Sequence, residues 1–136
     1  MDDRWLDSAA RPFDPPLTAA GVAQGSALGR RLKSFSPPVT KIYGSPLGRT
    51  VQTADAAAAE LGIDELYIEP GLVEVLDQGW YRCWNCSPSD PRGQANAATL
   101  LLSPAELKAQ VSPRVQVDHA PFFDVAAMGV RATDTT

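Results

Sequence analysis

Residues 45–54, with the sequence Ser-Pro-Leu-Gly-Arg-Thr-Val-Gln-Thr-Ala, constrain the fold of this chain most, because they join a strand to a helix. Residues 39–43 are β-branched and aromatic and predict a strand. Pro46 ends it, since proline has no N–H to donate and its fixed φ suits the first turn of a helix. Apolar residues then recur at steps of four and three, at Leu47, Val51, Ala54, Ala58 and Leu61. They predict an α-helix that ends at Gly62, with Arg49 in its first turn.

Arg49 is the first candidate binding residue. The unpaired amides and the positive dipole end of a helix N-terminus favour an anion, and a guanidinium fork fits two phosphate oxygens. The alternative is a solvated arginine or an ion-pair partner on the surface, which contributes little by itself. The position of Arg49 alone leaves both interpretations open.

A second helix is predicted to begin after Thr18, whose hydroxyl can cap it. Its expected inward stripe consists of Gly21, Gly25, Leu28, Leu32 and Phe35. Each glycine lowers helix propensity by roughly 1 kcal/mol relative to alanine. Close approach of this helix to a sheet would compensate for that loss, and simple tolerance of the glycines is the alternative. A third, short helix is predicted from the capping box of Ser103 and Glu106 to about Val111.

Two sequence blocks together resemble the histidine phosphatase superfamily, also called the phosphoglycerate-mutase-like proteins. The blocks are Leu-Thr-x-x-Gly-x-x-Gln at residues 17–24 and Ser-Pro-x-x-Arg-Thr-x-Gln-Thr-Ala at residues 45–54. Residues 11–18 and 69–74 are similar to the eukaryotic branch that contains the phosphatase domains of ubiquitin-associated and SH3 domain-containing proteins. The resemblance covers residues 11–74, a little under half of the 136 residues.

The resemblance implies an α/β fold, a three-layer sandwich of the phosphoglycerate-mutase-like type. It also implies a nucleophilic histidine that takes up a phosphoryl group as phosphohistidine, with positive charge around the transferring oxygens and no cofactor. Arg49 matches the arginine of the phosphate pocket, and Glu74 is the best match for the carboxylic acid that protonates the leaving oxygen. Pro70 ends the strand expected at residues 66–68, so Glu74 lies on a connection, where a merely solvated acid is the alternative.

Two histidine motifs of the family are absent from the printed sequence. It contains no Arg-His-Gly, and its single histidine, His119, has no neighbouring glycine and is expected on the surface or in a loop. We therefore expect a truncated or degenerate member without the first and the C-terminal strand of the sandwich. Residues 1–125 would form the partial domain and residues 126–136 a disordered tail. The full-length parent would hydrolyse phosphomonoesters, whereas this chain is predicted to be inactive.

Two alternatives belong to other functional classes. A non-catalytic module could use Arg49 to bind a phosphate or a phosphopeptide, or a scaffold could bind a partner through Trp80, Tyr81 and Trp84. For the phosphatase and the non-catalytic module the expected ligand of Arg49 bears a phosphate, whereas Arg49 would be dispensable in the scaffold. The sequence sets no oligomeric state.

Charge and cysteine content exclude other classes of partner. A net charge of −4 and a pI of about 4.8 argue against nucleic acid as a partner. The sequence has no run of about 18 apolar residues and no secretory pattern at Met1, which predicts no membrane partner and a cytoplasmic location. Cys83 and Cys86 could form a redox pair or half a zinc site, but no second pair exists. We expect two ordinary thiols and no metal.

Overall fold

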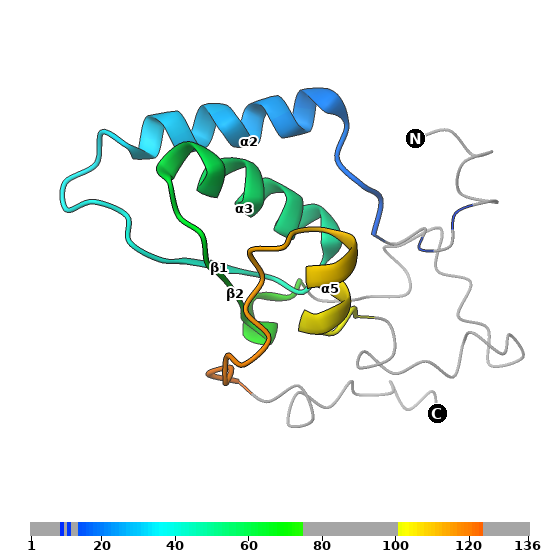
Figure 1. Ribbon diagram of the computed structural model, residues 1–136. Helices are drawn as coiled ribbons and strands as arrows, with labels where there is room; N and C mark the ends of the chain where they lie inside the picture. Colours follow the sequence, from blue (N-terminus) through cyan, green and yellow to red (C-terminus); the bar gives the residue numbers. More distant parts are fainter. Residues whose placement is uncertain (1–8, 10, 12–13, 75–100, 124–136) are drawn as a thin grey trace, which may run out of the picture.

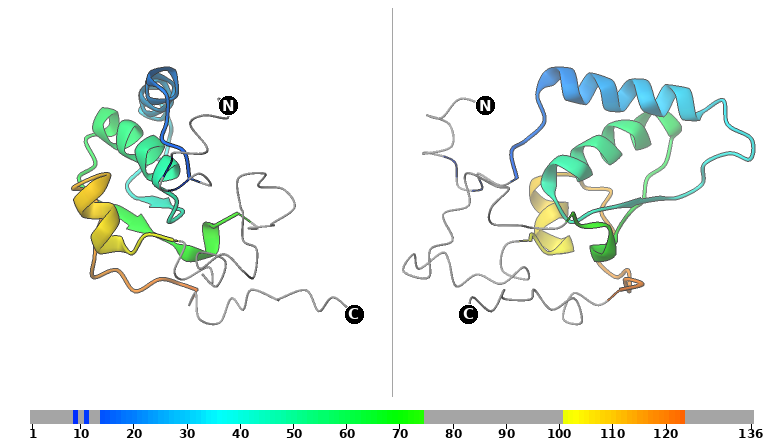
Figure 2. Two further views of the ribbon diagram at one scale, coloured as in Figure 1. Left: turned by 90° about the vertical axis from the view of Figure 1, so that its right-hand side faces the viewer. Right: turned by 180° about the vertical axis from the view of Figure 1, so that it is seen from behind.

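The structure is a computed structural model that describes residues 9, 11, 14–74 and 101–123. Its elements in chain order are α2 (Ala19–Leu32), β1 (Ile42–Gly44), α3 (Gly48–Leu61), β2 (Leu66–Ile68), the 3-10 helix η1 (Pro70–Leu72) and α5 (Pro104–Gln110). Helix α3 lies between α2 and the strands, and α5 lies beside the strands (Figures 1 and 2). The predicted α/β class is thus confirmed for the described residues.

Strands β1 and β2 are parallel neighbours, paired from Ile42 with Leu66 to Gly44 with Ile68. Helix α3 connects them, as a parallel pair requires a crossover. Val115 forms a bridge to Leu66, so the segment after α5 adds to the outer edge of β2. The expected position of β2 is confirmed, whereas β1 occupies residues 42–44 rather than 39–43.

Helix α3 follows the sequence prediction closely. It ends at Leu61, and Gly62 caps it in the left-handed conformation, at a φ of 72° that side chains other than glycine rarely adopt. At the other end Leu47 occupies the N-cap position and is buried. Pro46 therefore precedes the helix instead of lying in its first turn.

A single apolar cluster joins α3 to the strands, α5 and the segment that follows α5. Its buried members are Val51, Ala58, Leu66, Ile68, Leu107 and Val115. The valine, leucine and isoleucine side chains of this set contribute about 1.5–3 kcal/mol each when fully buried. The cluster fixes the end of α3 that carries Arg49 against β2.

Among the described elements, helix α2 packs on α3 and not on the two strands, which corrects the sequence-based expectation. Its buried residues are Gly25 and Gly29, whereas Leu28 and Phe35 of the expected stripe are exposed. An ideal Cβ on Gly29 would lie 2.6 Å from the carbonyl oxygen of Ala57. The stripe is wrong at Leu28 and Phe35 but right at Gly25, because the two backbones approach too closely for large side chains and the smallest residues form the contact.

Two predicted helix caps are confirmed. The Thr18 hydroxyl accepts a hydrogen bond from the Gly21 amide at 3.1 Å, and Ser103 and Glu106 form both hydrogen bonds of the capping box. None of the helices in the described ranges is long and apolar enough to cross a bilayer. The cysteines, the tryptophan-rich segment and the expected tail at residues 126–136 lie outside the described residues.

Candidate functional site

Arg49 and Glu74 meet at one edge of the parallel sheet. Arg49 follows β1 at the start of α3, and Glu74 follows β2 after the 3-10 helix η1. Because the carboxyl ends of parallel strands lie at the same edge, residues that follow the two strands become neighbours. Nη2 of Arg49 donates to Oε1 of Glu74 in an ion pair. The structure thus brings together the two site residues named from the sequence.

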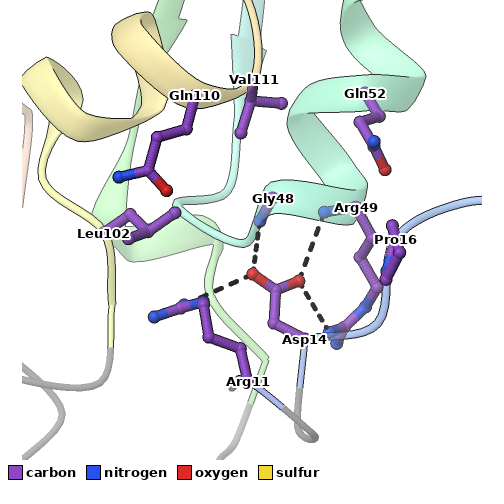
Figure 3. A pocket seen from close by; sticks show the side chains of 9 residues that line it. All are labelled: Arg11, Asp14, Pro16, Gly48, Arg49, Gln52, Leu102, Gln110 and Val111. Carbon is purple, nitrogen blue, oxygen red and sulfur yellow. Dashed lines mark hydrogen bonds and ion pairs between the residues drawn. The ribbon is translucent and has the colours of Figure 1, made fainter. Parts of the chain in front are cut away.

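Asp14 provides the cap that α3 lacks locally. Leu47 at the N-cap makes no side-chain hydrogen bond, so the first amides of α3 need an acceptor from elsewhere. The Asp14 carboxylate accepts from the Gly48 amide at 2.7 Å and from the Arg49 amide at 3.3 Å (Figure 3). Its Oδ1 also accepts from Nη1 of Arg49 at 3.3 Å. One buried carboxylate therefore holds both the helix N-terminus and the arginine side chain.

A small pocket of about 210 Å³ opens beside this carboxylate (Figure 3). Its lining residues are Arg11, Asp14, Pro16, Gly48, Arg49, Gln52, Leu102, Gln110 and Val111. Arg11 adds a second guanidinium, with Nη2 3.4 Å from Oδ2 of Asp14. One turn further along α3, Oε1 of Gln52 accepts a hydrogen bond from the Leu17 amide at 2.8 Å, which ties the chain before α2 to α3. The pocket therefore combines residues from three parts of the chain.

Among the residues that the structure describes, each charged side chain of this site is paired with an opposite charge. Two guanidinium groups, on Arg11 and Arg49, face two carboxylates, on Asp14 and Glu74, and all four are joined by ion pairs. The guanidinium forks and the N-terminus of α3 are the groups that proteins use to hold a phosphate. The arrangement can hold an anion, provided that the anion replaces a carboxylate at one of these donors.

His119 lies elsewhere, in a loop after α5, and does not line the pocket around Arg49. Its ring is surrounded by aromatic rings, with centroids 5.2 Å from Tyr67 and 5.9 Å from Tyr43 and Phe122. Nε2 of His119 lies 3.8 Å from Oε2 of Glu69. The expected loop position is correct, and the ring is largely covered by its neighbours.

Glu69 is a buried carboxylate that fastens the loop of His119 to the end of β2. Burial raises its pKa, but hydrogen bonds from the amides of Phe122, Gly71 and Phe123 and the charge of His119 outweigh that effect, so the pKa lies below its ordinary value. The bonds from Phe122 and Phe123 measure 2.8 and 3.3 Å. Glu69 thus has a structural role that the sequence did not suggest.

The sequence interpretation missed Asp14 and Arg11 as members of the site. A usable signal was present, because a helix that begins after Leu47 has no capping side chain of its own and must find an acceptor elsewhere. Among the residues the structure describes, no group of three or more His, Cys, Asp or Glu is placed to hold a metal ion.

A family model described as "Histidine phosphatase superfamily (branch 1)" matches residues 7–82, more than half of the chain. The chain is 28% identical over 118 residues to the human ubiquitin-associated and SH3 domain-containing protein A, an alignment that covers 85% of this chain and 16% of the relative. The mouse protein of that name is 30% identical over 111 residues, 79% of this chain and 15% of the relative.

A bacterial relative matches a shorter stretch more closely. The probable phosphoglycerate mutase GpmB of Proteus mirabilis is 44% identical over 66 residues, 48% of this chain and 29% of the relative. The chain therefore spans less than a third of the length of each of these relatives. The family match covers both the N-terminus of α3 with Arg49 and the loop with Glu74. The chain belongs to the histidine phosphatase superfamily.

Proposed function

We propose that the pocket around Arg49 binds a phosphate group and that this chain forms the phosphate-holding part of a histidine phosphatase domain. The observation that carries the proposal is the placement of the Arg49 guanidinium, which lies at the N-terminus of α3 in a pocket with a second guanidinium, that of Arg11. The family membership and the name of the bacterial relative, a probable phosphoglycerate mutase, support a phosphate-bearing ligand.

Each group at the site has a proposed role. Arg49 holds phosphate oxygens through its guanidinium fork, assisted by the dipole of α3. Glu74, on the loop beside Arg49, is the candidate proton donor to the leaving oxygen. The parent enzyme would hydrolyse phosphomonoesters through phosphohistidine, and the paired strands would belong to a three-layer sandwich. The soluble, cytoplasmic setting expected from the sequence suits such an enzyme.

Turnover by the 136-residue chain alone is not expected. Its single histidine, His119, packs among aromatic rings and does not line the pocket of Arg49. We expect no hydrolysis of a generic phosphomonoester by the purified chain. Hydrolysis that disappears in Arg49→Ala would contradict this part of the proposal.

Binding is tested by thermal melting in the presence of phosphate or vanadate. A ligand that binds only the folded state stabilises it by about 2.7 kcal/mol when its concentration is 100 times Kd. We expect the melting temperature to rise with phosphate, against chloride at matched ionic strength, and not to rise in Arg49→Ala. Arg30→Ala is the matched control, because Arg30 pairs with Glu60 at 2.8 Å near the other end of α3. An equal rise in Arg49→Ala refutes phosphate binding at this site.

A further inference from the structure

Arg49 contacts two carboxylates of very different burial. Nη1 lies 3.3 Å from Oδ1 of Asp14, whose side chain is 2% exposed, and Nη2 pairs with Glu74, whose side chain is 49% exposed. We propose that Asp14 is a positioning residue that anchors Arg49, and that Glu74 is an internal competitor that an incoming phosphate displaces from Nη2. This inference rests on the proposed function, and it assigns opposite effects on phosphate affinity to Asp14 and Glu74.

Asp14 is fixed because several donors share its carboxylate. Oδ2 accepts from the Gly48 amide at 2.7 Å, Oδ1 accepts from the Arg49 amide at 3.3 Å, and Arg11 lies 3.4 Å from Oδ2. An ideal Cβ on Gly48 would lie 3.2 Å from the same Oδ2, so the carboxylate is packed tightly against the backbone. Displacement of this buried carboxylate would break all of these contacts at once and unpack it from the backbone. A phosphate therefore does not take its place.

Glu74 is exchangeable because it lies on a loop and is half exposed. It follows the 3-10 helix η1 and is part of no helix or strand. Exposed ion pairs are weak, since both side chains remain accessible to water and salt. A phosphate dianion carries more charge than a carboxylate and offers a guanidinium two oxygens at once. Phosphate therefore competes successfully for Nη2 while Asp14 retains Nη1.

Substitutions of Asp14 and of Glu74 should change the phosphate affinity in opposite directions. Glu74→Gln keeps the shape of the side chain but removes the competing charge, so inorganic phosphate should bind up to about fivefold more tightly. Asp14→Asn frees the guanidinium from its anchor, so phosphate should bind at least about fivefold more weakly. Simple removal of negative charge near the pocket would instead tighten binding in both variants.

Affinity is measured by titrating inorganic phosphate while following the Nε–Hε signal of Arg49 by NMR, at a temperature where every variant is fully folded. A purely structural cap at Asp14 would lower the melting temperature of Asp14→Asn and leave this affinity unchanged. Glu60→Gln is the charge-matched control, because it removes one carboxylate from α3 roughly 16 Å from Arg49 along the helix. Its phosphate affinity should equal that of the unaltered protein.

The outcomes separate the two proposals. Phosphate binding through Arg49 in the unaltered protein, with tighter binding in Glu74→Gln and weaker binding in Asp14→Asn, supports the assignment. If phosphate binds through Arg49 but the two variants have equal affinities, or both bind more tightly, the roles assigned to Asp14 and Glu74 are overturned and the proposed function stands. If no protein of the set shifts the Arg49 signal with phosphate, the proposed function itself is refuted. Should Asp14→Asn fail to fold, unchanged or weaker binding in Glu74→Gln still overturns the competitor role.

Discussion

The contact between α2 and α3 makes Gly29 the most informative glycine to replace. In Gly29→Ala the new Cβ would lie 2.6 Å from the carbonyl oxygen of Ala57, 2.8 Å from Cα of Ala57 and 2.8 Å from Cβ of Glu60. Two of these atoms are backbone of α3 and cannot rotate away, so the helices must separate. Overpacking of this kind costs about 1–3 kcal/mol, and a backbone clash belongs at the upper end of that range.

Helix propensity acts in the opposite direction and must be subtracted. Alanine inside a helix is about 1 kcal/mol more favourable than glycine, so the net loss for Gly29→Ala is about 2 kcal/mol. At roughly 4 °C per kcal/mol the melting temperature should fall by about 8 °C. Urea unfolding followed by circular dichroism gives the free energy of unfolding directly.

Gly21→Ala is the matched control on the same helix. Its Cβ would lie 3.4 Å from the Leu17 side chain, which is ordinary van der Waals contact. Only the propensity gain remains, so this variant should be as stable as the unaltered protein or up to about 1 kcal/mol more stable. Equal stability of Gly29→Ala and Gly21→Ala would refute the close approach of α2 to α3.

Further predictions concern the buried carboxylate of Glu69, the capping box of α5 and the buried hydroxyl of Ser112. Glu69 has a lowered pKa, so its contribution to stability is complete above the pKa of an unfolded glutamate, about 4.3, and is lost as the pH falls through the lower folded value. As the pH falls into the acid range, the urea midpoint of Glu69→Gln should therefore fall less than that of the unaltered protein. Identical pH profiles of the urea midpoint in the two proteins would argue against a lowered pKa of Glu69. Ser103→Ala removes the capping box of α5 and should cost about 1 kcal/mol in urea unfolding, whereas no loss would mean that α5 needs no cap. Ser112→Ala removes a buried hydroxyl that donates to Asp55 and accepts from the Arg114 amide at 3.2 Å, and a loss of about 1–2 kcal/mol is expected. A neutral Ser112→Ala in the same assay would show that Asp55 and Arg114 suffice.

Local signals predicted the elements whose ends are marked by particular residues. Gly62 ends α3, Thr18 caps α2, and Ser103 with Glu106 caps α5, because each of these ends depends on groups within a few residues. The orientation of α2 was not predictable in this way. Its buried face depends on how closely α3 approaches, which is a property of two helices and not of one.

The candidate site, like the fold, was predictable from the sequence only in part. Arg49 and Glu74 follow the two strands, so a parallel pair brings them to one edge, and the sequence blocks pointed to both. Asp14 was missed because its function depends on contacts with the amides of residues 34 and 35 positions later in the chain. A contact between residues so far apart in the chain produces no periodic pattern in the sequence. An uncapped helix start, however, indicates that such an acceptor exists.

Helix α3 is shared by both contact regions of the described structure. One side meets α2 through Gly25 and Gly29, and another carries Val51 and Ala58 into the cluster with the strands and α5. Helix α2 can therefore separate without disturbing the strand cluster, and α5 can separate without disturbing α2, but neither region survives the loss of α3. Amide hydrogen exchange should accordingly be slowest in the middle of α3, where exchange requires global opening, and faster in α2 and α5. Arg49 thus lies in the first turn of the helix whose middle is expected to open last.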